Sequence, residues 1–339
     1  SGLSIAGMTE GRSDDFRKNF LVTHFFNPVR YMRLLELVAG EETDPEILQF
    51  FTDFGRFRLG KGIVFGKDTP NFIGNRIGTY GIAATFKAMM EMDYQVDEVD
   101  AITGPAMGHP GSASFGTIDL VGLDVLAHVT NTIYEGCPND EQRDVFQVPE
   151  FLSKMIEAGS LGRKTKAKGG FYRIQKEKDG SKTKLVVDWK TGEYRPKVRP
   201  KIESLKKAKA THDVKQRIHD VVFSDDRGGE FAWRLMRDTL AYSSIRFGEI
   251  SDSIVDIDNA MRWGYNWDLG PFETWDALGV AKVVEKMKAE GAEPAPWVSE
   301  MLAAGSESFY KESASGREYW DPGTKSYVAE PRPESFLFL

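Results

Sequence analysis

The chain of 339 residues has few of the residues that build disulfide frameworks and metal centres. It contains one cysteine, Cys137, so no disulfide can form within the chain and no cysteine-based metal site is expected. Its five histidines are scattered without the spacing of metal ligands, and we expect no metal site. No apolar run approaches the ~20 residues of a membrane-spanning helix, and no secretory signal opens the sequence. These features favour a reducing, intracellular setting.

The net charge of −7 hides an asymmetry along the chain. Residues 160–217 hold 19 lysines and arginines against 6 acidic residues, whereas the rest of the chain holds 25 against 45. A basic stretch can contact phosphate groups or an acidic partner, and it can equally be a solvated surface. The acidic remainder argues against a nucleic-acid-binding protein.

Residues 21–36 carry the strongest sign of chemistry. A β-prone apolar run ends in His24, the sequence Phe25-Phe26-Asn27-Pro28 follows it, and Glu36 lies twelve residues later inside the apolar stretch 34–38. A buried carboxylate needs a partner, and a histidine is a natural one because the carboxylate can orient the imidazole and raise its proton affinity. Such a pair can carry out general acid–base catalysis. The spacing alone is equally consistent with a core histidine beside a glutamate that points to solvent.

Three further motifs follow the His24 segment in order. Residues 67–76 read KDTPNFIGNR and residues 119–124 read DLVGLD. Residues 162–172 run from GRKT to GGFY. Taken with HFFNPV and LLELV, these motifs resemble the 3-hydroxyacyl-CoA dehydrogenases of fatty-acid β-oxidation. Two departures are Asn71, where the family usually has glycine, and two extra residues before the final Gly-Phe-Tyr. The motifs extend over about half of the chain, whereas one alone would be weak evidence.

The resemblance implies roles for particular residues. His24 would take the proton from the 3-hydroxyl group of the substrate while hydride passes to NAD, and Glu36 would orient the imidazole ring. Asn75 would offer its amide to the reacting oxygen or to the thioester carbonyl, although an asparagine here can instead cap a helix. Ser1 would match the family's active-site serine, although it can equally be a cloning remnant. Arg76 is expected to make a structural ion pair.

The dinucleotide fingerprint of the family is missing. No Gly-x-Gly-x-x-Gly motif for the pyrophosphate is present, and no acidic ribose-binding residue follows one. The first four residues resemble the middle of the family's dinucleotide domain. We therefore expect a C-terminal fragment that begins with a remnant of that Rossmann α/β domain at residues 1–28. The NAD site would lie mostly in a missing N-terminal domain, with no cofactor-binding residues here. This chain alone would then bind NAD weakly or not at all and show no turnover.

An internal repeat is visible in the second half of the chain. Four residues recur at an offset of 158 and four more at 157; the pairs are Arg76/Arg234, Ala83/Ala241, Glu91/Glu249, Asp100/Asp258, Phe115/Phe272, Thr117/Thr274, Asp119/Asp276 and Gly122/Gly279. The repeat predicts two copies of one helical domain, at about 72–172 and 230–290. Trp233 stands where Asn75 stands in the first copy, and an indole has a donor but no acceptor. The second copy is therefore expected to be structural.

The predicted fold is mainly α. Tandem helical domains of the dehydrogenase C-terminal type follow the Rossmann remnant, with small β-hairpins in the linker and the tail. The expected division is a dinucleotide-binding remnant at 1–28, a first helical domain at 29–172, a β-hairpin linker at 173–200, a second helical domain at 201–310 and a C-terminal tail at 311–339.

The resemblance implies an NAD-dependent oxidation of (S)-3-hydroxyacyl-CoA to 3-ketoacyl-CoA in the bacterial cytoplasm. The tandem copies resemble multifunctional proteins in which this dehydrogenase is fused to an enoyl-CoA hydratase. Expected partners are acyl-CoA, a fused or associated hydratase and a thiolase, with the two helical copies as an internal pseudo-dimer. The basic stretch can contact the phosphates of coenzyme A. Two alternatives stay open: a non-catalytic assembly module of a fatty-oxidation complex, and a related β-hydroxyacid dehydrogenase.

Overall fold

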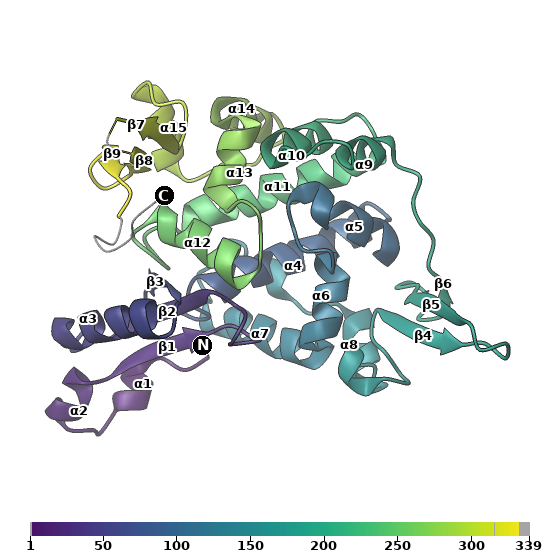
Figure 1. The fold of residues 1–339 in the computed structure, drawn as a ribbon, viewed down its shortest axis with the longest axis horizontal. Helices are drawn as coiled ribbons and strands as arrows, with labels where there is room; N and C mark the ends of the chain where they lie inside the picture. Colours follow the sequence, from purple (N-terminus) through teal and green to yellow (C-terminus); the bar gives the residue numbers. More distant parts are fainter. Residues whose placement is uncertain (1, 315, 332–339) are drawn as a thin grey trace.

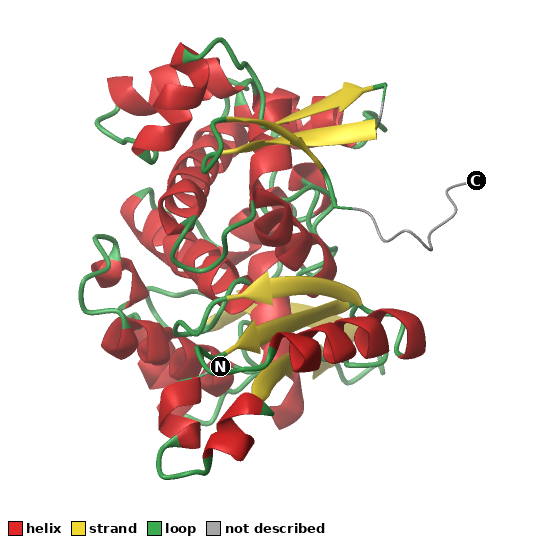
Figure 2. Ribbon diagram, turned by 90° about the vertical axis from the view of Figure 1, so that its left-hand side faces the viewer, coloured by secondary structure: helices red, strands yellow, loops and turns green. Residues whose placement is uncertain are grey.

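The computed structural model of this chain describes residues 2–314 and 316–331 (Figures 1 and 2). A small sheet with short helices lies at one end of the molecule, and helices fill the middle (Figure 1). Two further three-stranded sheets lie at the margins of the helical part (Figure 1).

The N-terminal part is an α/β unit built on three strands. Strands β1 and β2 are antiparallel, β2 and β3 are parallel, and β2 lies in the middle of the sheet. The sequence LLELVA forms β2 because it is apolar on both faces, as suits a strand covered on both sides. The elements of this unit are α1 (Ile5–Thr9), α2 (Asp14–Lys18), β1 (Leu21–Phe25), β2 (Leu34–Ala39), α3 (Pro45–Asp53), the π-helical turn η1 (Phe54–Arg58) and β3 (Gly62–Gly66).

This sheet corrects the expected fold class. A Rossmann remnant confined to residues 1–28 and followed directly by a helical domain from residue 29 is wrong. Strands β2 and β3 lie beyond residue 28 and complete the sheet that β1 begins. The physical reason is that a strand's backbone N–H and C=O groups need partners. Strand β2 finds them on both sides, in β1 and in β3.

The first helical region follows. Its longest helix is α4 (Gly74–Glu91). Helices α6 and α7 are separate, because Gly122 between them adopts a φ of +112° that favours glycine and breaks the run. The remaining elements are α5 (Val96–Ile102), η2 (Pro105–Met107), α6 (Ala113–Val121), α7 (Leu123–Gly136), η3 (Arg143–Phe146), α8 (Glu150–Glu157) and η4 (Arg163–Thr165).

Among the residues that the structure describes, no single helix is both long and apolar enough to cross a membrane. Helices α6 and α7 satisfy that test only when taken together, on length and composition alone, and they bend by 98° at their junction.

The second half of the chain repeats this plan. The hairpin expected between the helical regions is the antiparallel sheet of β4 (Tyr172–Lys176), β5 (Lys182–Val187) and β6 (Tyr194–Pro196). The helices after it are α9 (Glu203–Ala208), α10 (Val214–Val222), α11 (Arg227–Arg246), α12 (Ile254–Gly264), α13 (Pro271–Leu278), α14 (Val280–Ala289) and α15 (Pro296–Ala303). The tail forms the third sheet, of β7 (Tyr310–Ser313), β8 (Gly316–Asp321) and β9 (Ser326–Ala329).

Helices α4 and α11 pack against each other at the centre of the molecule (Figure 1). Tyr80 of α4 stacks on Tyr242 of α11 with ring centroids 3.7 Å apart. One hydrophobic core runs through both helical regions and reaches β2 at Leu34 and β3 at Val64. Helix α12 of the second region also contacts β2, β3 and α4. The second helical region therefore touches both the α/β unit and the first helical region. The five-part division of the chain stays a prediction, apart from the boundary at residue 28.

Candidate active site

Strands β1 and β2 bring His24 and Glu36 together. The two residues are directly opposite each other in the antiparallel register, so their side chains lie on the same face of the sheet. The His24 Nδ1 atom lies 2.5 Å from Glu36 Oε2. The structure thus places in contact the two residues that the sequence proposed as a pair.

Glu36 is held from its other side by the start of helix α4. Its side chain is fully buried, and Oε1 accepts hydrogen bonds from the backbone N–H groups of Ile73 (3.1 Å) and Gly74 (2.8 Å). The first N–H groups of a helix lack partners within the helix and carry the positive end of its dipole. Both features stabilise the carboxylate. Glu36 therefore links the N-terminus of α4 to the imidazole of His24.

The ring of His24 is exposed on one side only. The side chain is 20% exposed, and the rings of Phe26 and Phe72 meet it edge-on at centroid distances of 4.9 and 5.5 Å. Within the described residues, Nδ1 bonds Glu36 and Nε2 has no hydrogen-bond partner. A carboxylate on Nδ1 requires the proton of a neutral imidazole to sit there, which leaves the lone pair on Nε2. That nitrogen can accept a proton from a bound molecule.

Asn75 belongs to the same cluster. It directly follows Gly74 in the first turn of α4, and its Oδ1 accepts a hydrogen bond of 3.1 Å from the hydroxyl of Tyr265. The residue at the cap position of α4 is Ile73, so Asn75 does not cap the helix. The amide of Asn75 is consequently available for another role. Ser1, the remaining proposed site residue, lies outside the described residues.

Sequence reasoning missed Tyr265, which comes from the second helical region. A signal for it exists in Gly78, a glycine inside α4 that lowers helix propensity without an evident local reason. A Cβ atom at position 78 would lie 2.1 Å from Cζ of Tyr265. The glycine is therefore needed for the close approach of this ring.

Arg76 makes the structural ion pairs that were expected of it, one within the first helical region and one with the second. Its guanidinium is fully buried and lies 2.6 Å from Asp140 and 3.0 Å from Glu249. Its Nε donates to the hydroxyl of Tyr242 at 2.6 Å. Arg76 thus stabilises the contact between the helical regions and takes no part in the His24 cluster.

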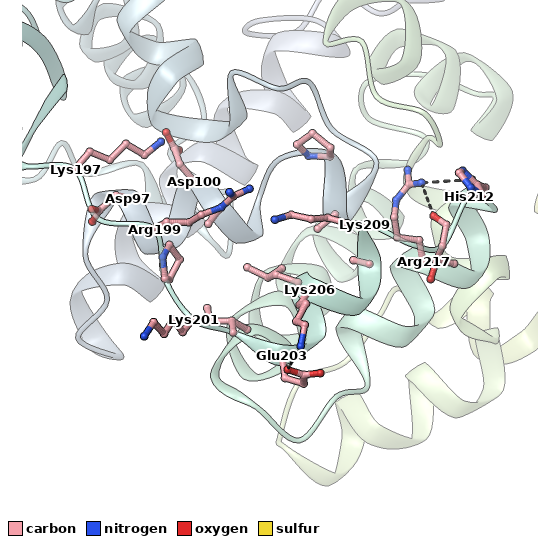
Figure 3. Close-up of a pocket in the computed structure, with 18 residues that line it drawn as sticks. Asp97, Asp100, Lys197, Arg199, Lys201, Glu203, Lys206, Lys209, His212 and Arg217 are labelled. Atoms are coloured by element: carbon pink, nitrogen blue, oxygen red, sulfur yellow. Dashed lines mark hydrogen bonds and ion pairs between the residues drawn. The ribbon is translucent and has the colours of Figure 1, made fainter. Parts of the chain in front are cut away.

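A second concave site collects part of the basic stretch (Figure 3). It is a groove of about 980 Å³ between α5 and α9–α10. Its two acidic residues on α5 are already engaged, Asp97 by Arg195 and Asp100 by backbone N–H groups. Its cationic lining attracts anions and consists of Lys197, Arg199, Lys201, Lys206, Lys209 and Arg217. In Figure 1, α5 and α9 lie at the upper right, away from β1 and β2.

In the His24 cluster, a buried carboxylate anchored on a helix N-terminus holds a partly exposed imidazole near the end of a strand in an α/β unit, an arrangement that can support general acid–base chemistry. Two domain models of one protein family match consecutive parts of the chain. The "3-hydroxyacyl-CoA dehydrogenase, NAD binding domain" matches residues 1–69. The "3-hydroxyacyl-CoA dehydrogenase, C-terminal domain" matches residues 72–173. The chain belongs to the 3-hydroxyacyl-CoA dehydrogenase family.

Individual relatives agree with the family. The chain is 47% identical to the "Probable 3-hydroxyacyl-CoA dehydrogenase" of Bacillus subtilis over 99% of its own length and 42% of the relative. It is 31% identical to the "Putative fatty acid oxidation complex trifunctional enzyme" of Rickettsia felis over 80% of its own length and 36% of the relative. The chain thus spans less than half the length of these relatives. The crystal structure of 3-hydroxybutyryl-CoA dehydrogenase from Escherichia coli superposes with a TM-score of 0.62 over 89% of this chain and 74% of that chain, at 20% identity, which shows a shared fold.

The match to the NAD-binding domain corrects two expectations. It extends over residues 1–69, so the dinucleotide-binding part does not end at residue 28 as a remnant. It also overturns the expectation that the cofactor site is missing from this chain. The physical reason is that the glycine fingerprint marks only the first turn of such a domain. The β1–β3 unit, which carries His24 and Glu36, belongs to that domain too.

Proposed function

We propose that the protein containing this chain is an NAD-dependent 3-hydroxyacyl-CoA dehydrogenase of fatty-acid β-oxidation, which oxidises (S)-3-hydroxyacyl-CoA to 3-ketoacyl-CoA. The observation that carries the proposal is the link from the α4 N-terminus through Glu36 to His24. The family supports the reaction class. The name of the Rickettsia felis relative supports fatty-acid oxidation as its setting.

In this proposal His24 is the general base. Its Nε2 takes the proton of the 3-hydroxyl group as the hydrogen on C3 leaves with its electron pair, so the C3–O bond becomes a carbonyl. Glu36 keeps the proton of the resting imidazole on Nδ1 and stabilises the imidazolium that forms. The Nδ2 group of Asn75 donates to the reacting oxygen or to the thioester carbonyl. In the reverse direction, the same imidazolium returns the proton to the oxygen.

NAD is the cofactor that the proposal requires, and bound NAD would accept the hydride from C3. The residues present suit such a group beside the base, because His24 is partly exposed and its Nε2 has no partner among the described residues, while the buried Phe26 and Phe72 hold its ring. His24 lies near the carboxyl end of β1, where α/β units commonly bind ligands.

The internal pseudo-dimer is also a proposal, and a reciprocal pair of contacts supports it. Arg76 of the first copy pairs with Glu249 of the second at 3.0 Å, and Arg234 of the second copy pairs with Glu91 of the first at 2.7 Å. Arg76 and Arg234, like Glu91 and Glu249, are equivalent in the repeat. Exchange of equivalent contacts is the mark of a two-fold interface. We further propose a cytoplasmic protein with a fused or associated hydratase and a thiolase as partners.

The experiment uses the full-length protein that contains this chain. It should reduce acetoacetyl-CoA with NADH, and His24→Ala should lower kcat by roughly 10²–10⁴, the usual worth of a general acid–base. NADH binding, followed by fluorescence, should be retained because the imidazole acts on the substrate proton. The matched control is His128→Ala, which removes an exposed histidine on α7 and should leave kcat unchanged.

Two outcomes would refute the proposal. Absence of turnover in the wild type would favour the assembly-module alternative, and turnover confined to other β-hydroxyacids in a substrate panel would favour the related dehydrogenase. A His24→Ala variant with full kcat would remove His24 from the mechanism even if the protein were active.

A further inference from the structure

Tyr265 lies just past the end of α12, in the second helical region, and reaches the first. Its hydroxyl donates to Oδ1 of Asn75 at 3.1 Å, although 190 residues separate the two along the chain. We propose that Tyr265 is a positioning residue, which fixes the Asn75 amide with its Nδ2 group toward the reacting oxygen. This inference rests on the proposed function, because it deepens the role of Asn75 in that reaction.

The packing around Tyr265 is built for this contact. Its ring fills the space over Gly78, one turn along α4 from Gly74, where a Cβ atom would come within 2.1 Å of Cζ and 2.4 Å of the hydroxyl oxygen. On another side, its ring lies 6.1 Å from the ring of Phe26, which in turn meets His24 edge-on at 4.9 Å. The phenol therefore stands directly beside the His24 cluster, held by close contacts.

The hydroxyl of Tyr265 is equipped to donate. Burial, with a smaller contribution from the carboxylate of Glu36, raises the pKa of Tyr265 well above its usual value. The phenol consequently keeps its proton throughout the working pH range, and that proton points to Asn75.

The consequence for Asn75 follows from the chemistry of an amide. A carboxamide has an acceptor oxygen on one side and two N–H donors on the other, and the two orientations differ by a rotation of about 180°. A donor fixed on Oδ1 favours one orientation and disfavours the other. In the favoured one, the N–H donors are turned away from Tyr265. In the other, the amide would present an oxygen to a substrate oxygen that bears negative charge, which is repulsive.

The second helical copy thus contributes to the site and is not purely structural. Its equivalent of Asn75 is Trp233, which bonds Glu290, so the contribution comes from another residue of that copy, one that is not among the eight matched pairs. Tyr265 acts through Asn75 and is not assigned any contact with the substrate.

A double-mutant cycle in the full-length protein tests the proposal. Tyr265→Phe keeps the ring and removes the hydroxyl, and kcat should fall roughly 3- to 10-fold, the usual worth of one hydrogen bond. In an Asn75→Ala background the same substitution should change kcat by less than about 2-fold, because residues that act as one unit do not add. KM and the NADH dissociation constant should stay unchanged in the single Tyr265→Phe variant.

Two further variants serve as controls. Tyr94→Phe removes another tyrosine hydroxyl between the copies, whose 2.6 Å hydrogen bond goes to the carbonyl of Arg227, and it should leave kcat unchanged. Gly78→Ala should displace the ring of Tyr265 and reproduce the loss of kcat. The unfolding midpoint of every variant establishes that it is folded.

The outcomes distinguish failure of the proposed function from failure of the positioning role of Tyr265. A wild type without turnover would refute the proposed function. An active wild type whose kcat does not change in Tyr265→Phe would refute the positioning role, as would an equal fractional loss in both the wild-type and the Asn75→Ala backgrounds. Loss of kcat confined to the background with Asn75 intact is the expected result.

Discussion

Helices α4 and α11 occupy equivalent places in the two helical copies, yet their N-termini are capped in different ways. Helix α11 is capped locally: Asp226, the residue just before it, accepts from the N–H groups of Gly228 and Gly229, each at 3.0 Å. Helix α4 has no side-chain cap of its own, and the carboxylate comes from Glu36 on strand β2. A carboxylate borrowed from another element can use its second oxygen elsewhere, and Glu36 uses it to hold His24.

Away from these ends, the two copies share their internal hydrogen bonds. Asp100 accepts from two successive backbone N–H groups and from the hydroxyl of Tyr172. Asp258 makes the corresponding three contacts, the last with Tyr310. The repeat therefore preserves the frame of the domain, and the difference between the copies is concentrated where α4 meets the α/β unit. The copies therefore differ at the N-termini of α4 and α11, where only α4 takes its cap from a residue that also holds His24.

The largest expected effect on stability is at Trp233, the counterpart of Asn75. Its indole is 7% exposed and donates to both oxygens of Glu290, at 2.8 and 3.0 Å. Trp233→Ala should cost roughly 3–5 kcal/mol of unfolding free energy, since it removes a large buried ring. Denaturant unfolding measures the loss, and kcat should stay within a few-fold where the protein remains folded. A stable variant with kcat lowered a hundredfold would place Trp233 in an active site and end the distinction between the copies.

The next effect is expected on kcat at Glu36, the residue of β2 that caps α4. In Glu36→Gln, the amide oxygen can still accept from Ile73 and Gly74, so the NH2 group faces Nδ1 of His24. That nitrogen must then accept, which moves the imidazole proton to Nε2 and removes the base. We expect kcat to fall roughly 10- to 100-fold, less than in His24→Ala. Steady-state kinetics measure it, and unaltered kinetics would show that the contact does not operate in solution.

The matched substitution in the second copy is at Asp226, the N-cap residue of α11. Asp226→Ala should cost about 1–2 kcal/mol of stability, as loss of an N-cap does. It should leave kcat unchanged. Outside α11, this carboxylate accepts hydrogen bonds from the backbone N–H and the hydroxyl of Ser204 on α9, which does not belong to the His24 cluster. Thermal unfolding and the acetoacetyl-CoA assay, run side by side, check both halves of the expectation. A parallel loss of kcat would mean that both caps serve the site.

A smaller, pH-dependent effect is expected where the second copy meets the sheet. Asp256 of α12 accepts from the N–H of Phe65 on β3 at 3.1 Å, and burial raises the pKa of this carboxyl from 3.8 to about 7. Between these two values the folded protein holds a proton that the unfolded chain has released. Stability from this group therefore falls as the pH rises through that window. Asp256→Asn cannot ionise, so its unfolding midpoint should rise relative to the wild type by a few degrees from pH 4 to 7 and then level off. Parallel curves for the two proteins would contradict the raised pKa.

Several elements follow from local sequence, and their prediction needed no tertiary information. The start of α3 is one, because Asp44 accepts from the N–H of Glu46 and a proline follows it at the first helical position. The contact of His24 with Glu36 is another, although the spacing alone left it open and the resemblance of the surrounding motifs favoured it. The hairpin around Gly192 is a third, where a positive φ of 75° suits glycine.

Other features could not be read locally. Strand β3 pairs in parallel with β2, and a parallel pair is joined by a long crossover, so nothing in the local sequence showed that residues 62–66 complete the sheet of residues 21–25. The break between α6 and α7 depends on one backbone angle at Gly122. The caps of α4 were missed because the carboxylate comes from 37 residues upstream.

The sequence by itself determined the family, the acid–base pair and the repeat, because each depends on residue identities at short or regular spacing. Only the tertiary structure decided which oxygen of Glu36 serves the helix and which serves His24, and that Tyr265 of the second copy meets Asn75 of the first. The physical reason is that such contacts join strands and helices far apart along the chain. Their geometry is set by the packing of α4 against α11 and α12 and by a glycine that leaves room for one ring.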